Sequence, residues 1–116
     1  MIRQRVRAIA EKEGFKLVDQ TKIVTAVSEL ARNTIIHGGG GTASVELIQE
    51  GLRSGIRVEF KDQGAGIADV DLAMKDGYTS GSGLGLGLGG AKRLTNDFQI
   101  YSKLGEGTRV SIIRWR

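Results

Sequence analysis

One long helical stretch, residues 20–36, constrains the fold more than any other segment of this sequence. Its apolar residues recur at the spacing of one helix face: Ile23, Val24, Val27, Leu30 and Ala31. Glu29 and Asn33 interrupt this pattern, and their spacing of four residues places them on nearly the same face. A helix with such a stripe must be covered by other elements, so we expect it to border a core with two polar groups at its margin.

Shorter periodicities predict the elements around this helix. A first helix is expected over residues 2–13, with Gly14 ending it, and Asp19 is expected to cap the long helix at its N-terminus. Two antiparallel hairpins are expected, one from strands 43–49 and 56–62 and one from strands 98–103 and 108–115. Further helices are expected at 84–96 and, as one short segment, at 69–76.

This order of elements predicts an α+β fold. We expect a two-layer α/β sandwich, with helices on one face of a mixed, mostly antiparallel sheet. The chain has 116 residues and no internal repeat, so a single domain over residues 1–116 is expected.

The composition excludes several classes of function. The chain has no cysteine, which excludes disulfides and thiol nucleophiles, and its single histidine cannot form a zinc cluster. The sequence contains no apolar run of the roughly 18 residues that a membrane span needs, and no signal-peptide core, so we expect no membrane association and a cytoplasmic location. The net charge of +4 is modest, the basic residues are scattered and aromatic residues are few, so no nucleic-acid partner is expected.

A first glycine-rich stretch, Asp62-Gln63-Gly64-Ala65-Gly66-Ile67, follows directly after a predicted strand. One interpretation is a tight turn, in which Asp and Gly are common. The other is a nucleotide site: the Asp62 carboxylate would accept a hydrogen bond from an exocyclic amine such as that of adenine. Gly64 and Gly66 would let the backbone close over a flat base.

A second glycine-rich stretch leads into the predicted helix at 84–96. Its residues are Gly81, Ser82, Gly83, Leu84, Gly85, Leu86 and Gly87. Backbone N–H groups at a helix start can hold phosphates, and glycines permit their close approach. No apolar strand precedes the stretch and no Gly-Lys-Ser/Thr ending follows, which disfavours a dinucleotide fold and a P-loop. A flexible loop is the alternative, but the alternating leucines favour an anchored segment.

Glu29 and Asn33 also have two interpretations. They can form a solvated helix edge, with Glu29 bonded to a neighbouring arginine. Alternatively, Asn33 supplies an oxygen ligand to magnesium, which shares its coordination with phosphate oxygens, and Glu29 orients or deprotonates an attacking hydroxyl.

Taken together, these stretches resemble the GHKL (Bergerat-fold) nucleotide-binding family. The matching motifs are the N box Glu29-x-x-x-Asn33, the first glycine box Asp62-x-Gly64-x-Gly66, the second glycine box Gly83-Leu84-Gly85-Leu86, and Gly107-Thr108 at the family's closing threonine. The resemblance implies ATP and Mg²⁺ as cofactors. It implies that Asp62 selects adenine, with Thr108 supporting that site, that the amides of 83–87 hold phosphates, and that Asn33 holds magnesium.

Within this family the chain is most similar to the small serine/threonine kinases that act as stressosome switches in bacterial sigma-factor control. That similarity implies phosphorylation of a Ser or Thr on STAS-domain partner proteins, with Glu29 as the base, and a downstream phosphatase as a further partner. Two departures are expected to matter. The chain opens almost directly into its first helix, so an edge strand is either trimmed or lost. The segment 68–80 between the glycine boxes is short, so we expect the nucleotide to be poorly covered and weakly bound by this chain alone, and a partner could complete the site.

Two other functions remain open from the sequence. An anti-sigma-factor kinase would use the same N box but would act mainly by holding its partner. A non-catalytic module would bind nucleotide as a structural ligand, and an intact Glu29 argues against this because binding alone needs no base.

Overall fold

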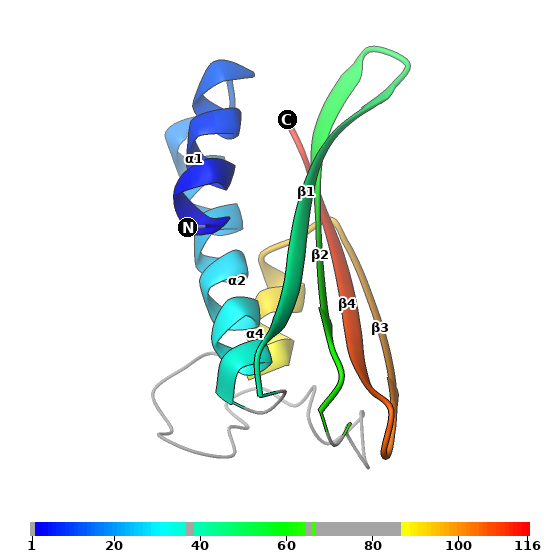
Figure 1. Cartoon of the computed structure of the whole chain (residues 1–116). Coiled ribbons are helices and arrows are strands. Elements are labelled where there is room, and N and C mark those ends of the chain that lie inside the picture. Colours follow the sequence, from blue (N-terminus) through cyan, green and yellow to red (C-terminus); the bar gives the residue numbers. More distant parts are fainter. Residues whose placement is uncertain (1, 37–38, 65, 67–86) are drawn as a thin grey trace.

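The computed structural model describes residues 2–36, 39–64, 66 and 87–116, and shows helices packed on one side of an antiparallel sheet (Figure 1). In chain order its elements are α1 (Ile2–Lys12), α2 (Leu17–Ile36), β1 (Gly41–Glu50), β2 (Arg53–Asp62), α4 (Gly87–Arg93), β3 (Asp97–Lys103) and β4 (Gly107–Trp115). This two-layer arrangement confirms the predicted α+β fold. The short helix expected at 69–76 lies outside the described residues.

The four described strands are ordered β1-β2-β4-β3, and every neighbouring pair is antiparallel. The first hairpin is longer than predicted, because pairing continues as far as Glu50 opposite Arg53 and leaves only Gly51 and Leu52 in the turn. Gly51 has φ of 61°, a conformation that a two-residue hairpin turn requires and that glycine adopts without strain. The expected turn over residues 50–55 was therefore too long.

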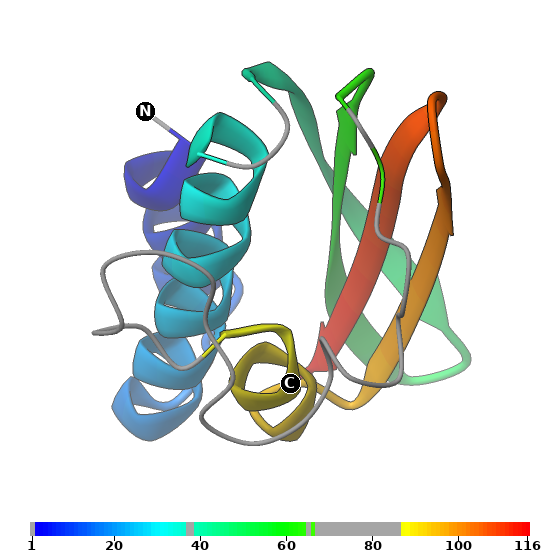
Figure 2. The same ribbon diagram turned by 90° about the horizontal axis from the view of Figure 1, so that it is seen from below.

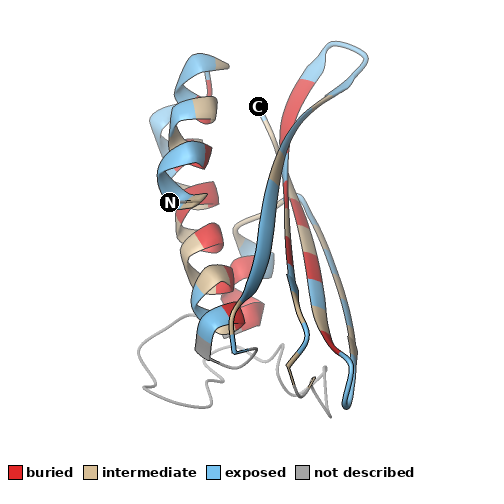
Figure 3. Ribbon diagram, in the orientation of Figure 1, coloured by how far each residue is buried: buried red, intermediate tan, exposed pale blue. Residues whose placement is uncertain are grey.

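The core lies between α2 and the two central strands. On β2, the alternation predicted from the sequence is confirmed: Ile56, Val58 and Phe60 are buried and face the helices. Their partners on the helical side include Ile23, Val27 and Leu30, all buried on α2. Figure 3 shows this burial on the facing sides of the two layers, while β1 and the hairpin tip are exposed. The core thus fixes α2 against β2 along most of its length.

The predicted stop at Gly14 is confirmed. Gly14 has φ of 80° and its N–H donates to the Glu11 carbonyl at 3.2 Å, while the Phe15 N–H donates to the Ala10 carbonyl at 2.9 Å. These two bonds form a Schellman end, which satisfies the last carbonyls of α1 and turns the chain toward α2. Phe15 is then buried in the core beside this turn.

The predicted N-cap at Asp19 was wrong. Helix α2 starts at Leu17, and the Gln20 N–H already donates to the Lys16 carbonyl at 2.9 Å, so Asp19 lies within the first turn. Its carboxylate instead accepts a hydrogen bond from Arg114 at 2.6 Å. A partner distant in sequence therefore determines the position of this side chain, rather than the local capping geometry.

Helix α4 packs beside α2 on the same side of the sheet, as the view from below shows (Figure 2). Leu88 and Ala91 are buried there and Leu94 is partly buried, as their spacing predicted. The helix ends at Arg93, earlier than the expected end at 96. The reason is that the Asn96 N–H leaves the helical pattern and donates to the Ile113 carbonyl of β4 at 2.9 Å.

Candidate functional site

Three of the predicted site segments meet at one end of the sheet. There, the last turns of α2, the end of β2 and the start of β4 lie at the same level of the molecule (Figure 1). Gly41 makes the link between α2 and β2 tight: an added Cβ would lie 2.9 Å from the Thr34 side chain and 2.2 Å from the Lys61 carbonyl oxygen. Thr34, which directly follows Asn33 on α2, therefore lies close to the end of β2 that carries Asp62.

Asp62 is the last residue of β2 and is half-buried. Its Oδ1 accepts the backbone N–H of Gly64 at 2.9 Å, which folds the start of the glycine stretch back onto the carboxylate. Within the described part of the chain, Oδ2 has no hydrogen-bond partner. The turn interpretation is thus confirmed for residues 62–64, and the nucleotide interpretation stays a prediction.

Two glycines hold this turn against the hairpin of β3 and β4. A Cβ on Gly66 would lie 2.3 Å from the Lys103 carbonyl oxygen, and a Cβ on Gly107 would lie 2.2 Å from the Asp62 carbonyl oxygen. Both residues also have positive φ, 81° at Gly66 and 107° at Gly107, which side-chain-bearing residues rarely adopt. Glycine is therefore required at both positions for the backbones to meet.

Thr108 lies opposite Asp62 in the pairing of β2 with β4. Its Oγ1 is 2.8 Å from Oγ of Ser102, and the Ser102 hydroxyl donates to the Gly107 carbonyl at 3.1 Å. Either hydroxyl can be the donor in this pair; when the Ser102 proton goes to the Gly107 carbonyl, Thr108 donates to Ser102 and its oxygen keeps its lone pairs. Sequence reasoning missed Ser102, although the hairpin register that places it opposite Thr108 could have indicated it.

Glu29 and Asn33 are both half-buried on α2. Glu29 also lines a groove of about 520 Å³ between α1 and α2. The groove is lined by Arg3, Gln4, Arg7, Ala8, Glu11, Val24, Thr25, Ser28 and Glu29. Glu29 therefore borders an open groove between the two helices.

The second glycine stretch is described only from Gly87 onward. Gly81, Ser82, Gly83, Leu84, Gly85 and Leu86, all predicted to contact phosphates, lie outside the described residues. Gly87 is the first residue of α4, so the stretch leads into a helix as expected. The roles predicted for these residues stay predictions.

No cluster of three or more His, Cys, Asp or Glu side chains that could hold a metal occurs within the described ranges. Asn33 remains the one predicted metal ligand among them. A single amide oxygen suits Mg²⁺, which commonly takes only one or two protein ligands and shares the rest of its sphere with phosphates and water. Among the same residues, no helix is long and apolar enough to cross a membrane.

The sequence model of histidine kinase-, DNA gyrase B- and HSP90-like ATPases matches residues 18–116. The chain therefore belongs to this family, the GHKL ATPases, and the resemblance seen in its motifs is confirmed.

Its relatives include a serine/threonine-protein kinase and anti-sigma F factors. The chain is 42% identical to the serine/threonine-protein kinase RsbT of Bacillus subtilis (strain 168), over 97% of this chain and 85% of that protein. It is 33% identical to the anti-sigma F factor of Anoxybacillus flavithermus (strain DSM 21510 / WK1), over 97% of this chain and 80% of that protein. Among solved structures, the mycobacterial sensor histidine kinase MprB aligns with a TM-score of 0.61 at 22% identity, covering 83% of this chain and 71% of that one, which supports the fold.

Proposed function

We propose that this protein is an ATP- and Mg²⁺-dependent serine/threonine protein kinase of the cytoplasm. Its substrates would be STAS-domain partner proteins in bacterial stress signalling, and a downstream phosphatase would be a further partner. One observation carries the proposal: the chain is 42% identical, over nearly its whole length, to a protein named as a serine/threonine-protein kinase. The placement of Glu29 beside an open groove supports the same reading, because a kinase needs a carboxylate that can reach an acceptor hydroxyl.

The described end of the sheet fits an adenine nucleotide. The Oδ2 atom of Asp62 would accept a hydrogen bond from the exocyclic amine of the base, since Oδ1 is already bonded to Gly64. The backbones at Gly66 and Gly107 lie so close to neighbouring backbone that no side chain fits there. A planar base beside Asp62 would therefore contact backbone without obstruction by a side chain at these two positions. Ser102 would hold the Thr108 hydroxyl in one orientation toward the same site.

Asn33 would supply the protein's oxygen to Mg²⁺. When bound with ATP, Mg²⁺ neutralises charge on the phosphate oxygens, which is a main contribution to phosphoryl transfer. Its position on α2 limits the χ1 rotamers of Asn33, which would favour a small set of positions for its oxygen.

Glu29 would accept the proton of the substrate hydroxyl. It precedes Asn33 by one helical turn, so a hydroxyl entering from the groove between α1 and α2 would meet the carboxylate beside the phosphate-binding end of the helix. The groove also contains Arg3 and Arg7, which would offer hydrogen bonds to the incoming segment of the partner.

A second candidate function is that of an anti-sigma-factor kinase, which mainly holds its partner and is released by phosphorylation. The observation in its favour is the 33% identity to an anti-sigma F factor over 97% of this chain. Both functions use the same site, so they differ in the partner that binds tightly rather than in the chemistry.

The test is incubation with γ-labelled ATP, Mg²⁺ and a STAS-domain partner, comparing the wild type with Glu29→Ala. We expect label on a partner Ser or Thr with the wild type, loss of transfer in Glu29→Ala, and unchanged ATP affinity in that variant. Glu59→Ala is the matched control. Glu59 on β2 is also half-buried, but it lies on the face of the sheet that points away from the helices. It should transfer label like the wild type.

Two results would contradict the proposal. Equal loss of ATP binding and transfer in Glu29→Ala would remove the role of base from this residue. Tight partner binding with no transferred label would favour the holding function or a non-catalytic module in which nucleotide acts only as a regulator.

A further inference from the structure

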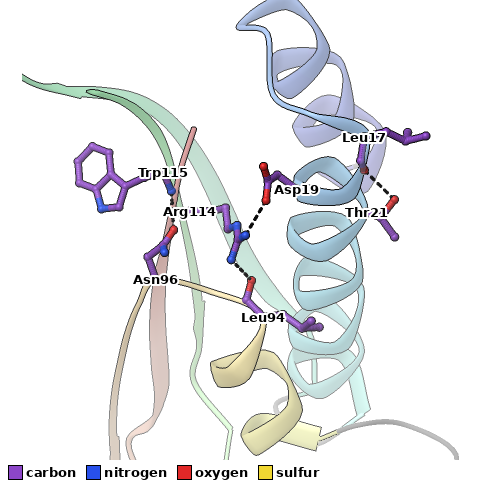
Figure 4. Close-up of polar contacts among 7 residues, drawn as sticks. All are labelled: Leu17, Asp19, Thr21, Leu94, Asn96, Arg114 and Trp115. Atoms are coloured by element: carbon purple, nitrogen blue, oxygen red, sulfur yellow. Dashed lines mark hydrogen bonds and ion pairs between the residues drawn. The ribbon is translucent and has the colours of Figure 1, made fainter. Parts of the chain in front are cut away.

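Arg114 joins three elements on the inner face of the sheet. Its side chain is only 14% exposed, its Nη2 donates to Oδ1 of Asp19 at 2.6 Å, and its Nη1 donates to the Leu94 carbonyl at 3.3 Å (Figure 4). Asp19 lies in the first turn of α2, and Leu94 directly follows α4. We call Arg114, Asp19 and the Leu94 carbonyl the Arg114 clamp.

Two of the elements that the clamp joins, α2 and β4, carry described residues of the candidate site at their other ends. From the clamp, α2 runs to Asn33, β4 runs back to Thr108, and α4 runs back to Gly87, where the second glycine stretch ends (Figure 1). A side chain that fixes these elements at one end therefore also fixes the relative positions of their distant ends, because helices and paired strands are stiff over this length.

Helix α4 depends on such support. Three of its seven residues are glycine, namely Gly87, Gly89 and Gly90. Glycine is the poorest helix former apart from proline, and so short a helix is unstable without tertiary contacts. Leu88 and Ala91 pack it into the core, and the clamp holds the carbonyl just beyond its last turn.

The burial of Arg114 is costly, which argues for a specific role. Its Nε is buried and has no hydrogen-bond partner in the described part of the chain. Replacing a buried ion pair by apolar side chains of similar size is often neutral or stabilising. The clamp is therefore weak as a source of stability, but its two-pronged geometry defines where α4 lies relative to α2.

We propose that Arg114 is a positioning residue for nucleotide binding. Through Asp19 and the Leu94 carbonyl it sets the positions of α2 and α4 relative to β4, so that Asn33 on the last turns of α2 and Thr108 at the start of β4 are arranged around the same nucleotide. The inference rests on the proposed function only in taking ATP as the ligand, and it does not need phosphoryl transfer.

The test compares the wild type with Arg114→Lys and Asp19→Asn. Lysine keeps the positive charge but lacks the two guanidinium nitrogens that donate to Asp19 and to the Leu94 carbonyl at the same time. Asparagine at position 19 keeps an acceptor oxygen but removes the negative charge. For Arg114→Lys we expect a rise of about tenfold in the Kd for a non-hydrolysable ATP analogue and in KM for ATP, which corresponds to about one tenth of the free protein holding the binding-competent arrangement. The kcat at saturating ATP should stay within about twofold, because bound nucleotide then holds the site together.

Hydrogen exchange gives an independent readout of the same variants. Without nucleotide, the amides of Ala91 and Lys92, which lie beyond the first four residues of α4, should exchange faster in Arg114→Lys than in the wild type, because α4 loses the contact just after its last turn. Asp19→Asn should show the same change more weakly. The double variant should exchange no faster than Arg114→Lys alone, because both substitutions break the same contact.

The matched control is Arg57→Lys. Arg57 also pairs with a carboxylate, Glu46 at 2.7 Å, but on the exposed face of the sheet away from the helices. This variant should leave the Kd for the analogue and the exchange of the α4 amides unchanged.

The outcomes separate the inference from the proposed function. If Arg114→Lys lowers the unfolding temperature but the folded protein binds the analogue with the wild-type Kd, the role is structural and the inference is overturned. If the wild type binds the analogue but phosphorylates no partner, the kinase proposal fails, and the Kd values still decide the inference. If the wild type binds no adenine nucleotide, both fail.

Discussion

Asp62 and Gly107 meet backbone to backbone where β2 ends and β4 begins, so closely that a Cβ on Gly107 would lie 2.2 Å from the Asp62 carbonyl oxygen. The strand pairing continues at Thr108, which lies opposite Asp62. Two motifs that are far apart in the sequence therefore share one contact. The position of the Asp62 backbone depends on the absence of a side chain at Gly107.

The first prediction concerns this contact. Gly107→Ala should lower the free energy of unfolding by about 3 kcal/mol or more, because an L-residue at φ of 107° is strained and the new methyl group meets backbone that must shift. Gly105→Ala is the control: it has φ of 80° but open space around its Cβ, so only the conformational strain of about 1 kcal/mol should remain. Urea unfolding measures both. Equal losses of unfolding free energy in the two variants would show that the close approach of Gly107 to Asp62 does not contribute to stability.

The second prediction concerns the choice of base. In Asp62→Asn, the new side-chain oxygen can still accept the Gly64 N–H, which places the NH₂ group where Oδ2 of Asp62 was. That NH₂ would face the amine of adenine, donor against donor. We expect ATP affinity to fall roughly 30-fold to 100-fold, the usual cost of leaving such groups unpaired.

Inosine triphosphate provides the counterpart to that measurement, because its base presents a carbonyl oxygen in place of the amine. The same variant should therefore bind inosine triphosphate better than the wild type does, while unfolding at a similar urea concentration. A parallel loss for both nucleotides would place the base elsewhere and remove Asp62 from its recognition.

Local sequence patterns predicted those parts of the fold that local physics determines. The alternation on β2, the apolar stripe of α2 and the glycine stop after α1 were all correct, since each depends on residues a few positions apart. The errors came from distant partners. Asp19 suits an N-cap, but Arg114 lies near it only after the chain has folded, and no local pattern shows this.

The candidate site divides in the same way. The glycine pattern after Asp62 correctly indicated a position, Gly66, at which the backbone conformation and the close approach to Lys103 require glycine. The four-residue spacing of Glu29 and Asn33 correctly placed both on one helix. Ser102 was missed because its only signal is its register opposite Thr108, which depends on where the hairpin turn falls. Pairing across strands had to be known before this residue could be assigned.

The third prediction uses the single tryptophan of the chain as a reporter. The Trp115 ring lies over Gly55 on the outer face of the sheet, where a Cβ on Gly55 would be 2.6 Å from it, and Arg53 stacks on the ring at 4.0 Å. Gly55→Ala should push the ring toward solvent, shift its fluorescence to longer wavelength and cost about 1 kcal/mol of stability. ATP affinity should not change, because the helices and the candidate site lie on the other face. An unshifted spectrum would mean that the ring does not rest on Gly55.

The fourth prediction concerns Mg²⁺. If Asn33 supplies an oxygen to the ion, Asn33→Ala should weaken ATP binding about tenfold in the presence of Mg²⁺, roughly the value of one lost ligand contact. With EDTA, the variant and the wild type should bind ATP with the same, weaker affinity, because the contact is then absent from both. Arg32→Ala serves as the control, since Arg32 is exposed on the same turn of α2 and should behave like the wild type in both buffers. A loss in Asn33→Ala that persists in EDTA would show that Asn33 contacts the nucleotide or supports α2 without the ion.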